Sequence, residues 1–299
     1  MEILNRALVA GKGSPLDGTA IPFEPRDLER VGPEDIKTRL DDILLSDHPE
    51  MALVYLKLAG FLEHYLPDIY ALWEFDDGSE EYKNLWEHTL KVVSQTPAST
   101  ILRWTALLHD IGKIKTKKID DRGRINFIGH EQVGAAMASK IMKKLRFRPE
   151  EAEKIRFLVL SHLRCTQYDS SWTDSAVRRL GKDLGEHLRD CIEHSKADIT
   201  TKHAGKKEKY HTLLDELSRR HEKILEEDSR PPHLPSGLGN QIMQAFDLQA
   251  GPAVGKIRSA LQERVESGTL EPAREPEYYI EYLKNEGNIV IKGAETEKT

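Results

Sequence analysis

The sequence has little cysteine and no long apolar run. Two cysteines in 299 residues are too few for a disulfide framework, which favours a reducing compartment. No stretch approaches the roughly 20 apolar residues needed to span a bilayer, and the N-terminus lacks the apolar core of a signal peptide. These absences predict a cytoplasmic protein that does not associate with a membrane.

Several well-known catalytic motifs are also missing. The chain has no Walker A loop, no dinucleotide-binding glycine fingerprint and no Ser-His-Asp nucleophile set. The segment GKGSPLDG near the N-terminus lacks a Lys-Ser/Thr ending, so we interpret it as a glycine-rich turn. The net charge of −6 gives no global attraction to nucleic acid, and any polyanion site must therefore be local.

The hydrophobic pattern is helical from Pro33 onward. Strand-type alternation is almost absent before NIVIKG near the C-terminus, which predicts an all-α protein. Residues 1–31 show scattered Gly and Pro without periodicity, so we expect an extended arm there. The segment SRPPHLPSGLG interrupts the helical pattern after residue 228 and predicts a boundary before a small helical tail at 229–299.

A cluster of potential metal ligands is the main chemical feature. His109 and Asp110 end an apolar helix that begins near Ile101, where two polar groups need compensation for their burial. Imidazole and carboxylate ligands without thiolate suit Zn, Mn, Fe or Ni. His88 and Asp198 supply a second residue of each type, enough for one octahedral ion with two positions left for water and substrate. The alternatives are a satisfied core histidine at 88, a solvated aspartate at 198 and an ordinary helix end at 109–110.

Cations gather in the loop that follows this pair. Lys113 stands three residues after Asp110, and the preceding Gly permits a turn that brings its ammonium over the metal site. The loop from Lys113 to Arg124 carries six cations, which we interpret as a local attraction for anions, although charge runs are usually only solvated. The candidates for phosphate contact are Lys113, Lys115, Arg122, Arg124, His130, Arg164 and Lys202.

The motifs LWEHTLKVV, ALLHDIGKIKT and FIGHEQVGAAMASKIMKKLRF, followed by a distal Ala-Asp, resemble the signature of HD-domain metal-dependent phosphohydrolases. In particular they resemble the HD domain of bacterial tRNA nucleotidyltransferases, the CCA-adding enzymes. The likeness runs from about Arg30 to about Leu270 and includes the helical body and the C-terminal tail of those enzymes. Their catalytic head has no counterpart here, and no paired DxD carboxylates follow the glycine-rich turn, so we expect no polymerase activity.

The resemblance implies an HD-domain helical bundle flanked by smaller helical regions. The predicted divisions are an arm at 1–31, a body-like region at 32–79, the HD domain at 80–228 and the tail at 229–299. The implied ligands are His88, His109, Asp110 and Asp198. His130 and His162 either complete a second metal bridged by Asp110 or donate to substrate phosphate; their other readings are an N-terminal helix contact and a helix C-cap.

The expected chemistry is metal-assisted phosphoester hydrolysis. A water activated by the metal attacks phosphorus, with one or two ions of Mn, Ni, Co, Mg, Fe or Zn. Lys113 stabilises the charge, and Glu131 either orients His130 or handles the proton of the attacking water.

By likeness the substrate is a nucleotide, an RNA 3′-end or tRNA, with opening of a 2′,3′-cyclic phosphate as the leading reaction. Two alternatives stay open: an HD enzyme for another nucleoside phosphate, and a non-catalytic tRNA- or RNA-binding module.

Overall fold

The computed structural model describes residues 1–13, 23–28, 31–75, 84–229 and 234–285. It divides into two compact units, Met1–Glu222 and Lys223–Thr299. The prediction of an all-α protein is confirmed, because the only strands in the described ranges are the two short ones of a hairpin, β1 (Lys118–Ile119) and β2 (Ile125–Asn126). They pair antiparallel with Lys118 opposite Asn126.

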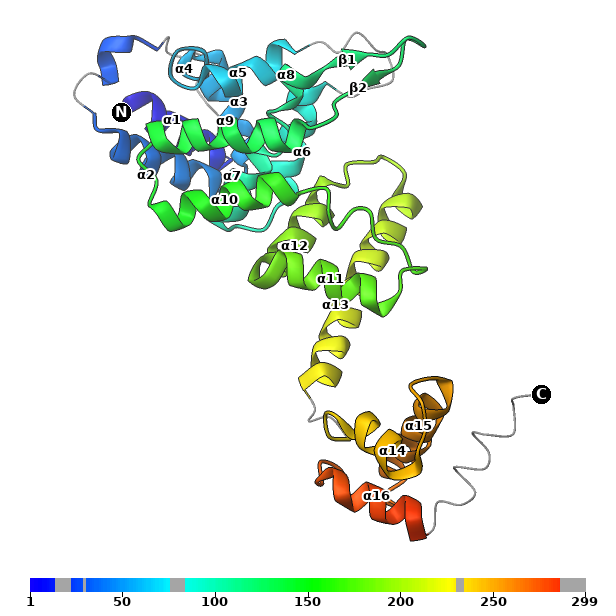
Figure 1. Ribbon diagram of the computed structural model, residues 1–299. Helices are drawn as coiled ribbons and strands as arrows, with labels where there is room; N and C mark the ends of the chain where they lie inside the picture. Colours follow the sequence, from blue (N-terminus) through cyan, green and yellow to red (C-terminus); the bar gives the residue numbers. More distant parts are fainter. Residues whose placement is uncertain (14–22, 29–30, 76–83, 230–233, 286–299) are drawn as a thin grey trace. The chain divides into compact units, whose positions relative to one another are not determined.

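The first unit is built from helices, as the pattern from Pro33 onward predicted. Its N-terminal part contains α1 (Glu2–Gly11), η1 (Pro25–Leu28), α2 (Pro33–Leu44), α3 (Pro49–Leu58), α4 (Phe61–Tyr65) and α5 (Pro67–Glu74). The part that carries the predicted metal ligands contains α6 (Leu85–Gln95), α7 (Thr100–Leu108), α8 (Lys113–Thr116), α9 (His130–Lys144), α10 (Pro149–Ser161), α11 (Asp174–Leu184), η2 (Gly185–His187), α12 (Leu188–Asp198) and, as far as Glu222, α13 (Ala204–Ser229). Figure 1 shows α9 and α10 lying side by side, and the β1–β2 hairpin extending from the same unit.

The expectation of an extended arm at residues 1–31 is wrong for its first part. Residues Glu2–Gly11 form α1, and Ile3, Leu4 and Ala7 are buried on its inner face. The helix packs against α2 and α3. The apolar residues of this segment have a helical spacing. The prediction missed it because it treated the segment together with the Gly- and Pro-rich stretch that follows. Residues 14–22 and 29–30 of the predicted arm lie outside the described residues.

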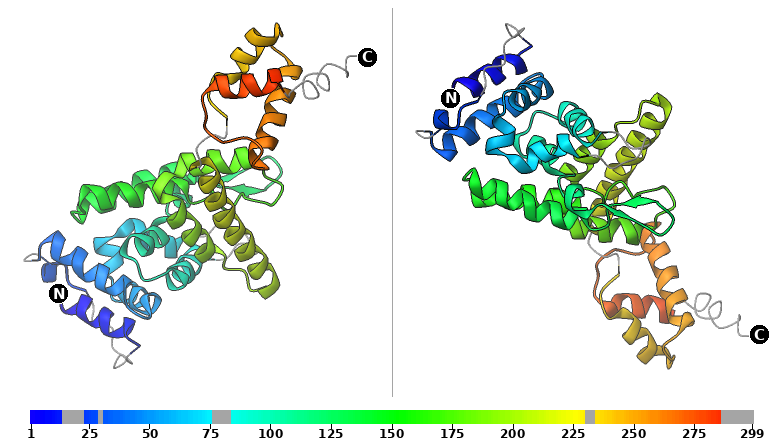
Figure 2. Two further views of the ribbon diagram at one scale, coloured as in Figure 1. Left: turned by 90° about the horizontal axis from the view of Figure 1, so that it is seen from below. Right: turned by 90° about the horizontal axis from the view of Figure 1, so that it is seen from above.

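One continuous hydrophobic core joins the N-terminal helices to the ligand-bearing helices. It includes Leu4, Leu56 and Ile69 on one side and Trp86, Leu108 and Ile141 on the other. The predicted boundary between residues 79 and 80 therefore divides two regions that share a core, and the two turned views of Figure 2 show α1–α5 against the helices that follow. The domain divisions otherwise stay predictions.

A buried arginine fixes α7, the helix that leads to His109, against its neighbours. Arg103 donates from Nη1 to the carbonyl of Leu44 at 2.6 Å and from Nε to the carbonyl of Thr96 at 2.9 Å. It thereby satisfies carbonyl groups at the C-terminal ends of α2 and α6, which would otherwise be buried without a donor. Trp104, the next residue of α7, donates from Nε1 to Asp41 Oδ1 at 2.7 Å. The N-terminal helices thus help to hold the chain segment that carries the site.

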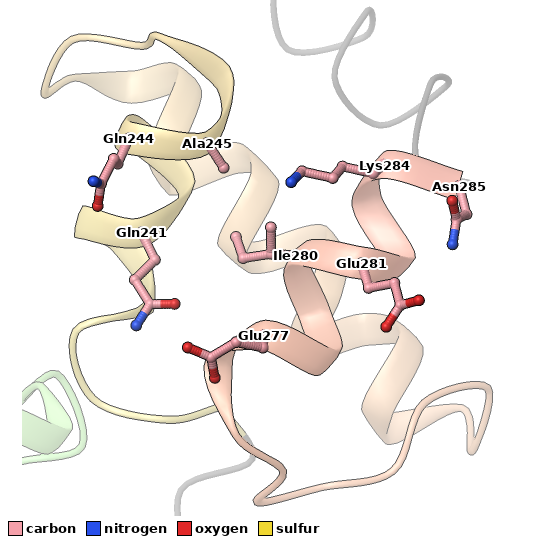
Figure 3. A pocket seen from close by; sticks show the side chains of 8 residues that line it. All are labelled: Gln241, Gln244, Ala245, Glu277, Ile280, Glu281, Lys284 and Asn285. Atoms are coloured by element: carbon pink, nitrogen blue, oxygen red, sulfur yellow. The ribbon is translucent and has the colours of Figure 1, made fainter.

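The second unit has its own small core. Its helices are α14 (Leu238–Phe246), α15 (Pro252–Glu266) and α16 (Pro276–Asn285). Leu238, Ile257, Leu261 and Tyr279 are fully buried between them. A hollow of about 710 Å³ is lined by residues of α14 and α16, among them Gln241 and Glu277, whose side chains approach one another in Figure 3. None of the predicted site residues lies there.

None of the described helices is both long enough and apolar enough to cross a membrane.

Candidate metal centre

The six residues predicted as ligands come from five helices or their ends and lie close together. His88 lies in the middle of α6, and Asn84 caps that helix by accepting from the backbone N–H groups of Trp86 and Glu87. The remaining ligand candidates stand at helix ends: His109 and Asp110 follow α7, His130 begins α9, His162 follows α10 and Asp198 ends α12. Helix ends allow side chains from different directions to converge on one point.

Asp110 lies between two groups of ligand atoms. Its Oδ2 is 3.5 Å from His88 Nε2 and 3.3 Å from His109 Nε2. Its Oδ1 is 3.4 Å from His130 Nε2 and 3.8 Å from His162 Nε2. The ligand atoms of His88, His109 and Asp110 lie within 4.8 Å of one another, as do those of Asp110, His130 and His162. Each oxygen of this one carboxylate therefore faces its own pair of imidazoles.

Asp198 joins the first of these groups. Its Oδ1 lies 3.1 Å from His88 Nε2 and 3.4 Å from His109 Nε2. The two imidazole nitrogens are themselves 3.2 Å apart. The first group thus consists of His88, His109, Asp110 and Asp198, and the second consists of His130, His162 and the shared Asp110.

In each of the four histidines of the two groups, the Nδ1 atom lies next to an oxygen atom that fixes the orientation of the ring. The Nδ1 atoms of His109, His130 and His162 lie 2.7–2.9 Å from the backbone carbonyls of residues 106, 127 and 159. The Nδ1 of His88 lies 3.1 Å from Thr200 Oγ1. A carbonyl oxygen can only accept, so the first three rings donate from Nδ1 and leave Nε2 facing Asp110. This support from behind is how metal-binding histidines are usually oriented.

The donor set and its spacing fit divalent cations. An octahedral ion with bonds of about 2.1 Å holds neighbouring ligand atoms about 3 Å apart. The contacts within the first group are 3.1–3.5 Å, close to that spacing. In the second group, His130 Nε2 and His162 Nε2 are 3.2 Å apart. Four imidazoles and two carboxylates also match the ligand chemistry of Zn, Mn, Fe, Co and Ni.

The charges in the cluster are strongly coupled. Burial alone would lower the pKa of His109, but the carboxylates of Asp110 and Asp198 outweigh it and raise that pKa to about 10. Burial would raise the pKa of Asp110, yet the charges of His109 and Lys113 hold it well below the usual carboxyl range. Despite burial, the pKa of Asp198 is likewise held well below the usual carboxyl range by His109 and His88, so both carboxylates of the cluster are ionised at neutral pH. For His162 the balance is reversed. Burial and the charge of His109 outweigh the carboxylate of Asp110 and lower the pKa of His162 to about 4.

One side of the cluster is open to solvent. The side chains of His88, Asp198 and Lys113 are 16%, 20% and 25% exposed, whereas those of His109, Asp110 and His162 are at most 3% exposed. Lys113 Nζ lies 2.6 Å from Asp110 Oδ2, as the sequence predicted when it placed this ammonium over the site. The first group is therefore accessible to solvent past His88, Asp198 and Lys113.

Gly112 has a role that the sequence did not predict. Its backbone is ordinary right-handed helical, with φ −68° and ψ −21°, so the turn itself does not require glycine. Instead, a Cβ at this position would lie 2.0 Å from the carbonyl oxygen of His130 and 2.6 Å from the backbone nitrogen of Gly134. Glycine is needed here because α8 and α9 approach so closely.

The remaining predicted residues lie around the cluster rather than in it. Glu131 is 3.6 Å from His130 Nδ1, on the side of the ring that faces away from Asp110. Arg164 pairs with Asp183 at 2.6 Å, and Arg124 pairs with Asp120 at 2.8 Å, both on the exposed surface. The other candidates for phosphate contact, Lys115, Arg122 and Lys202, are exposed.

Sequence reasoning missed His194. Its ring centroid lies 5.1 Å from that of His109 and 6.1 Å from that of His162, and neither ring nitrogen has a hydrogen-bond partner. Burial and the charge of His109 lower its pKa to about 3. A signal was present, since residues 194 and 198 are four apart on α12 and therefore share one face with Asp198.

Comparison with known proteins agrees with this geometry. The HD-domain family matches residues 85–230, a range that contains all six ligand candidates. The chain is 30% identical over 257 residues to the CC-adding tRNA nucleotidyltransferase of Thermus thermophilus, which covers 84% of this chain and 57% of that protein. It is 26% identical over 258 residues to the A-adding tRNA nucleotidyltransferase of Deinococcus radiodurans, covering 83% of this chain and 58% of that protein.

A shorter likeness extends to a multifunctional CCA protein of Polaromonas naphthalenivorans, 26% identical over 159 residues, with 52% of this chain and 37% of that protein covered. The chain thus spans less than three fifths of the length of the relatives it matches. The HD domain is a fold of metal-dependent hydrolases, and the His and Asp groups described above could hold such a metal. The chain therefore contains an HD domain and is a relative of the CC- and A-adding tRNA nucleotidyltransferases over most of its length.

Proposed function

We propose that this chain is a metal-dependent phosphohydrolase acting on nucleotides or RNA ends, with 2′,3′-cyclic phosphates as its leading substrates. The observation that carries the proposal is the convergence of His88, His109, Asp110 and Asp198 on one solvent-accessible point. The open side matters because a metal enclosed on all sides by protein ligands serves structure rather than catalysis.

In this proposal the first group holds a divalent ion, and Asp110, His130 and His162 hold a second one. An ion bound by these residues would supply water activation and polarisation of a phosphoryl oxygen. The protein contributes the orientation of the ligands, because the oxygen behind each imidazole fixes the direction in which Nε2 points. His130 and His162 contact substrate phosphate instead if only one ion is bound.

Lys113 is the residue we assign to charge stabilisation. Its ammonium is 2.6 Å from Asp110 Oδ2 and stands at the open side of the first group. From there it can donate to a phosphoryl oxygen as negative charge accumulates on it, which typically contributes a factor of about 10² to 10³ in kcat. Glu131 acts on the far side of His130, so we assign it to orienting that ring rather than to contact with the attacking water.

The β1–β2 hairpin and its flanks carry exposed cations that could attract an anionic substrate. Lys115, Lys118, Arg122 and Arg124 are exposed in this region. In a chain of net charge −6, such a concentration beside the cluster favours an anionic substrate. The names of the relatives point to tRNA, and this supports an RNA end as the larger substrate.

The test is a panel of phosphoesters with Mn²⁺, Ni²⁺, Co²⁺ and Mg²⁺. Adenosine 2′,3′-cyclic phosphate, adenosine 2′-monophosphate, adenosine 5′-monophosphate and ATP are compared with a tRNA that ends in a 2′,3′-cyclic phosphate. The proposal expects turnover of the cyclic compounds with at least one ion, and loss of it in Asp110→Ala. The matched control is Asp42→Ala, which removes an exposed carboxylate on α2.

Each other result has a definite meaning. Turnover of the 5′-monophosphate or of ATP alone would replace the proposal with a different nucleoside phosphohydrolase. Tight tRNA binding with no turnover of any compound under any ion would instead identify a non-catalytic RNA-binding module.

A further inference from the structure

A second cavity adjoins the metal centre without containing any of its ligands. It encloses about 300 Å³ and is formed by three chain segments: the loop after α10, the loop after α12 and the first turns of α13. Its lining includes Cys165, Tyr168, Thr200, Lys206, Tyr210 and Leu214. We call it the Tyr210 pocket.

The Tyr210 pocket and the metal centre share structural elements. Two of its three segments begin just after ligand candidates, because Cys165 follows His162 by three residues and Ile199 directly follows Asp198. Thr200 belongs to both, since it lines the pocket and its Oγ1 lies 3.1 Å from His88 Nδ1. His88 is also one of the residues that border the open side of the centre. The pocket therefore lies next to a metal-ligand candidate, on the Nδ1 side of the His88 ring.

The loop that separates the two sites is held in place. Gln95 donates from Nε2 to the carbonyl of Ala197 at 2.7 Å and to that of Ile199 at 3.4 Å. Lys207 donates in turn to Gln95 Oε1 at 2.7 Å. These bonds connect α6, the end of α12 and the start of α13. The distance between the metal ligands and the pocket is therefore set by the fold.

The lining has the composition of a site for a flat aromatic group. Cys165, Tyr168 and Leu214 are buried and provide an apolar floor. Tyr210 is 40% exposed, so one part of its ring is accessible. Lys206 Nζ lies 5.9 Å from the centre of that ring, and three threonines, Thr166, Thr200 and Thr201, are the other polar residues of the lining. Cavities of this size with mainly apolar walls and a few polar groups are typical small-molecule sites.

We propose that the Tyr210 pocket binds the base of the nucleotide whose phosphate lies at the metal centre, with the base stacked on Tyr210. This inference rests on the proposed function and names the substrate class more closely, as a nucleotide or a terminal nucleotide of RNA rather than a simple phosphoester. Stacking on an aromatic ring tolerates all four bases, so the pocket selects for the presence of a base rather than its identity. Lys206 stands where it can contact a phosphate or ribose oxygen of the same nucleotide.

The test compares a substrate that has a base with one that does not. Adenosine 2′,3′-cyclic phosphate and 1-O-methylribose 2′,3′-cyclic phosphate have the same reacting group, and kcat/KM is measured for both. In the wild type the adenosine compound is preferred. In Tyr210→Ala this preference falls by about tenfold or more through a higher KM, whereas Tyr210→Phe keeps it within about twofold because the stacking ring remains.

A matched control is available in Trp73→Ala. Trp73 is 43% exposed, carries Lys57 Nζ at 3.3 Å from its ring centroid and does not line the Tyr210 pocket. This variant is expected to keep the wild-type preference. An equal loss of turnover on both substrates in Tyr210→Ala, or an unchanged preference, would overturn the assignment of the pocket.

Failure of the proposed function is separated from failure of the pocket by a binding measurement. If the wild type hydrolyses neither compound with any ion, adenosine 2′-monophosphate is titrated into the protein by calorimetry. The pocket predicts binding that weakens in Tyr210→Ala and not in Trp73→Ala. No binding to the wild type, or equal binding to all three proteins, would refute it independently of catalysis.

Discussion

Replacing Asp110 with alanine tests the central feature of the site, because one carboxylate contributes to both ligand groups. Its Oδ2 faces His88 and His109, and its Oδ1 faces His130 and His162. Loss of an outer partner of a metal ligand typically costs about 10- to 100-fold in affinity, and loss of a ligand costs more. We therefore expect Asp110→Ala to weaken metal binding at least about a hundredfold in both groups at once.

The size of the effect can be stated for thermal unfolding. At a metal concentration of about 100 times Kd, binding stabilises the wild type by about 2.7 kcal/mol, whereas a hundredfold weaker variant gains only about 0.4 kcal/mol at the same concentration. For a unit of this length, 1 kcal/mol corresponds to about 2–4 °C in Tm. The addition of Mn²⁺ should thus raise the Tm of the wild type by about 5–10 °C and that of Asp110→Ala by about 1 °C.

Two assays check this expectation. Elemental analysis of the purified proteins reports bound metal, and scanning fluorimetry with and without Mn²⁺ reports the shift in Tm. The variant Asp42→Ala, which removes an exposed carboxylate, serves as the control and should behave like the wild type. Unchanged metal content in Asp110→Ala, with an unchanged response to Mn²⁺, would refute the claim that this carboxylate binds the metal.

Three further predictions concern residues at or beside the cluster. Lys113→Met should keep the wild-type metal content and lower kcat by about 10² to 10³, because a donor to the phosphoryl oxygen is lost; an unchanged kcat would show that the ammonium only pairs with Asp110. Because Asp110 and Asp198 raise the pKa of His109 to about 10, metal binding must displace its proton, and affinity for Mn²⁺ measured by chelator competition should rise by up to about tenfold per pH unit between pH 7 and 9. A constant affinity over that range would contradict this proton displacement. His194→Phe should keep bound metal and raise the free energy of unfolding by about 1 kcal/mol, since it removes two unpaired buried nitrogen atoms; loss of metal in this variant would mean that those nitrogens serve the site.

The helical character of the chain from Pro33 onward could be predicted from the sequence, and the convergence of the ligand candidates from the family resemblance, for identifiable reasons. Polar residues at the end of an apolar helix, as at His109 and Asp110, need partners when buried, and this requirement can be read without coordinates. The helix start at Pro33 follows from the preference of proline for a first helical turn, and α3 begins at Pro49 in the same way. The family resemblance then predicted that His88, Asp198, His130 and His162 lie close to His109 and Asp110.

Other features depend on distances that no local pattern contains. The sequence suggested that the glycine before Lys113 permits a turn, but its actual constraint is the backbone of α9. Glu131 stands beside His130 in the sequence, yet the orientation of the ring places it away from Asp110. The Tyr210 pocket combines residues 165–168, 199–201 and 206–214, and its composition becomes apparent only when these three segments are brought together.

The close approach at Gly112 has a consequence for how the two ligand groups are related. The residue that follows Asp110 by two positions abuts the peptide group of His130, so the carboxylate and the first residue of α9 cannot move independently. Even a methyl group at position 112 would force α9 outward and carry His130 with it. The spacing between the backbones that carry Asp110 and His130 is thus set by direct main-chain contact, and any side chain at position 112 would change it.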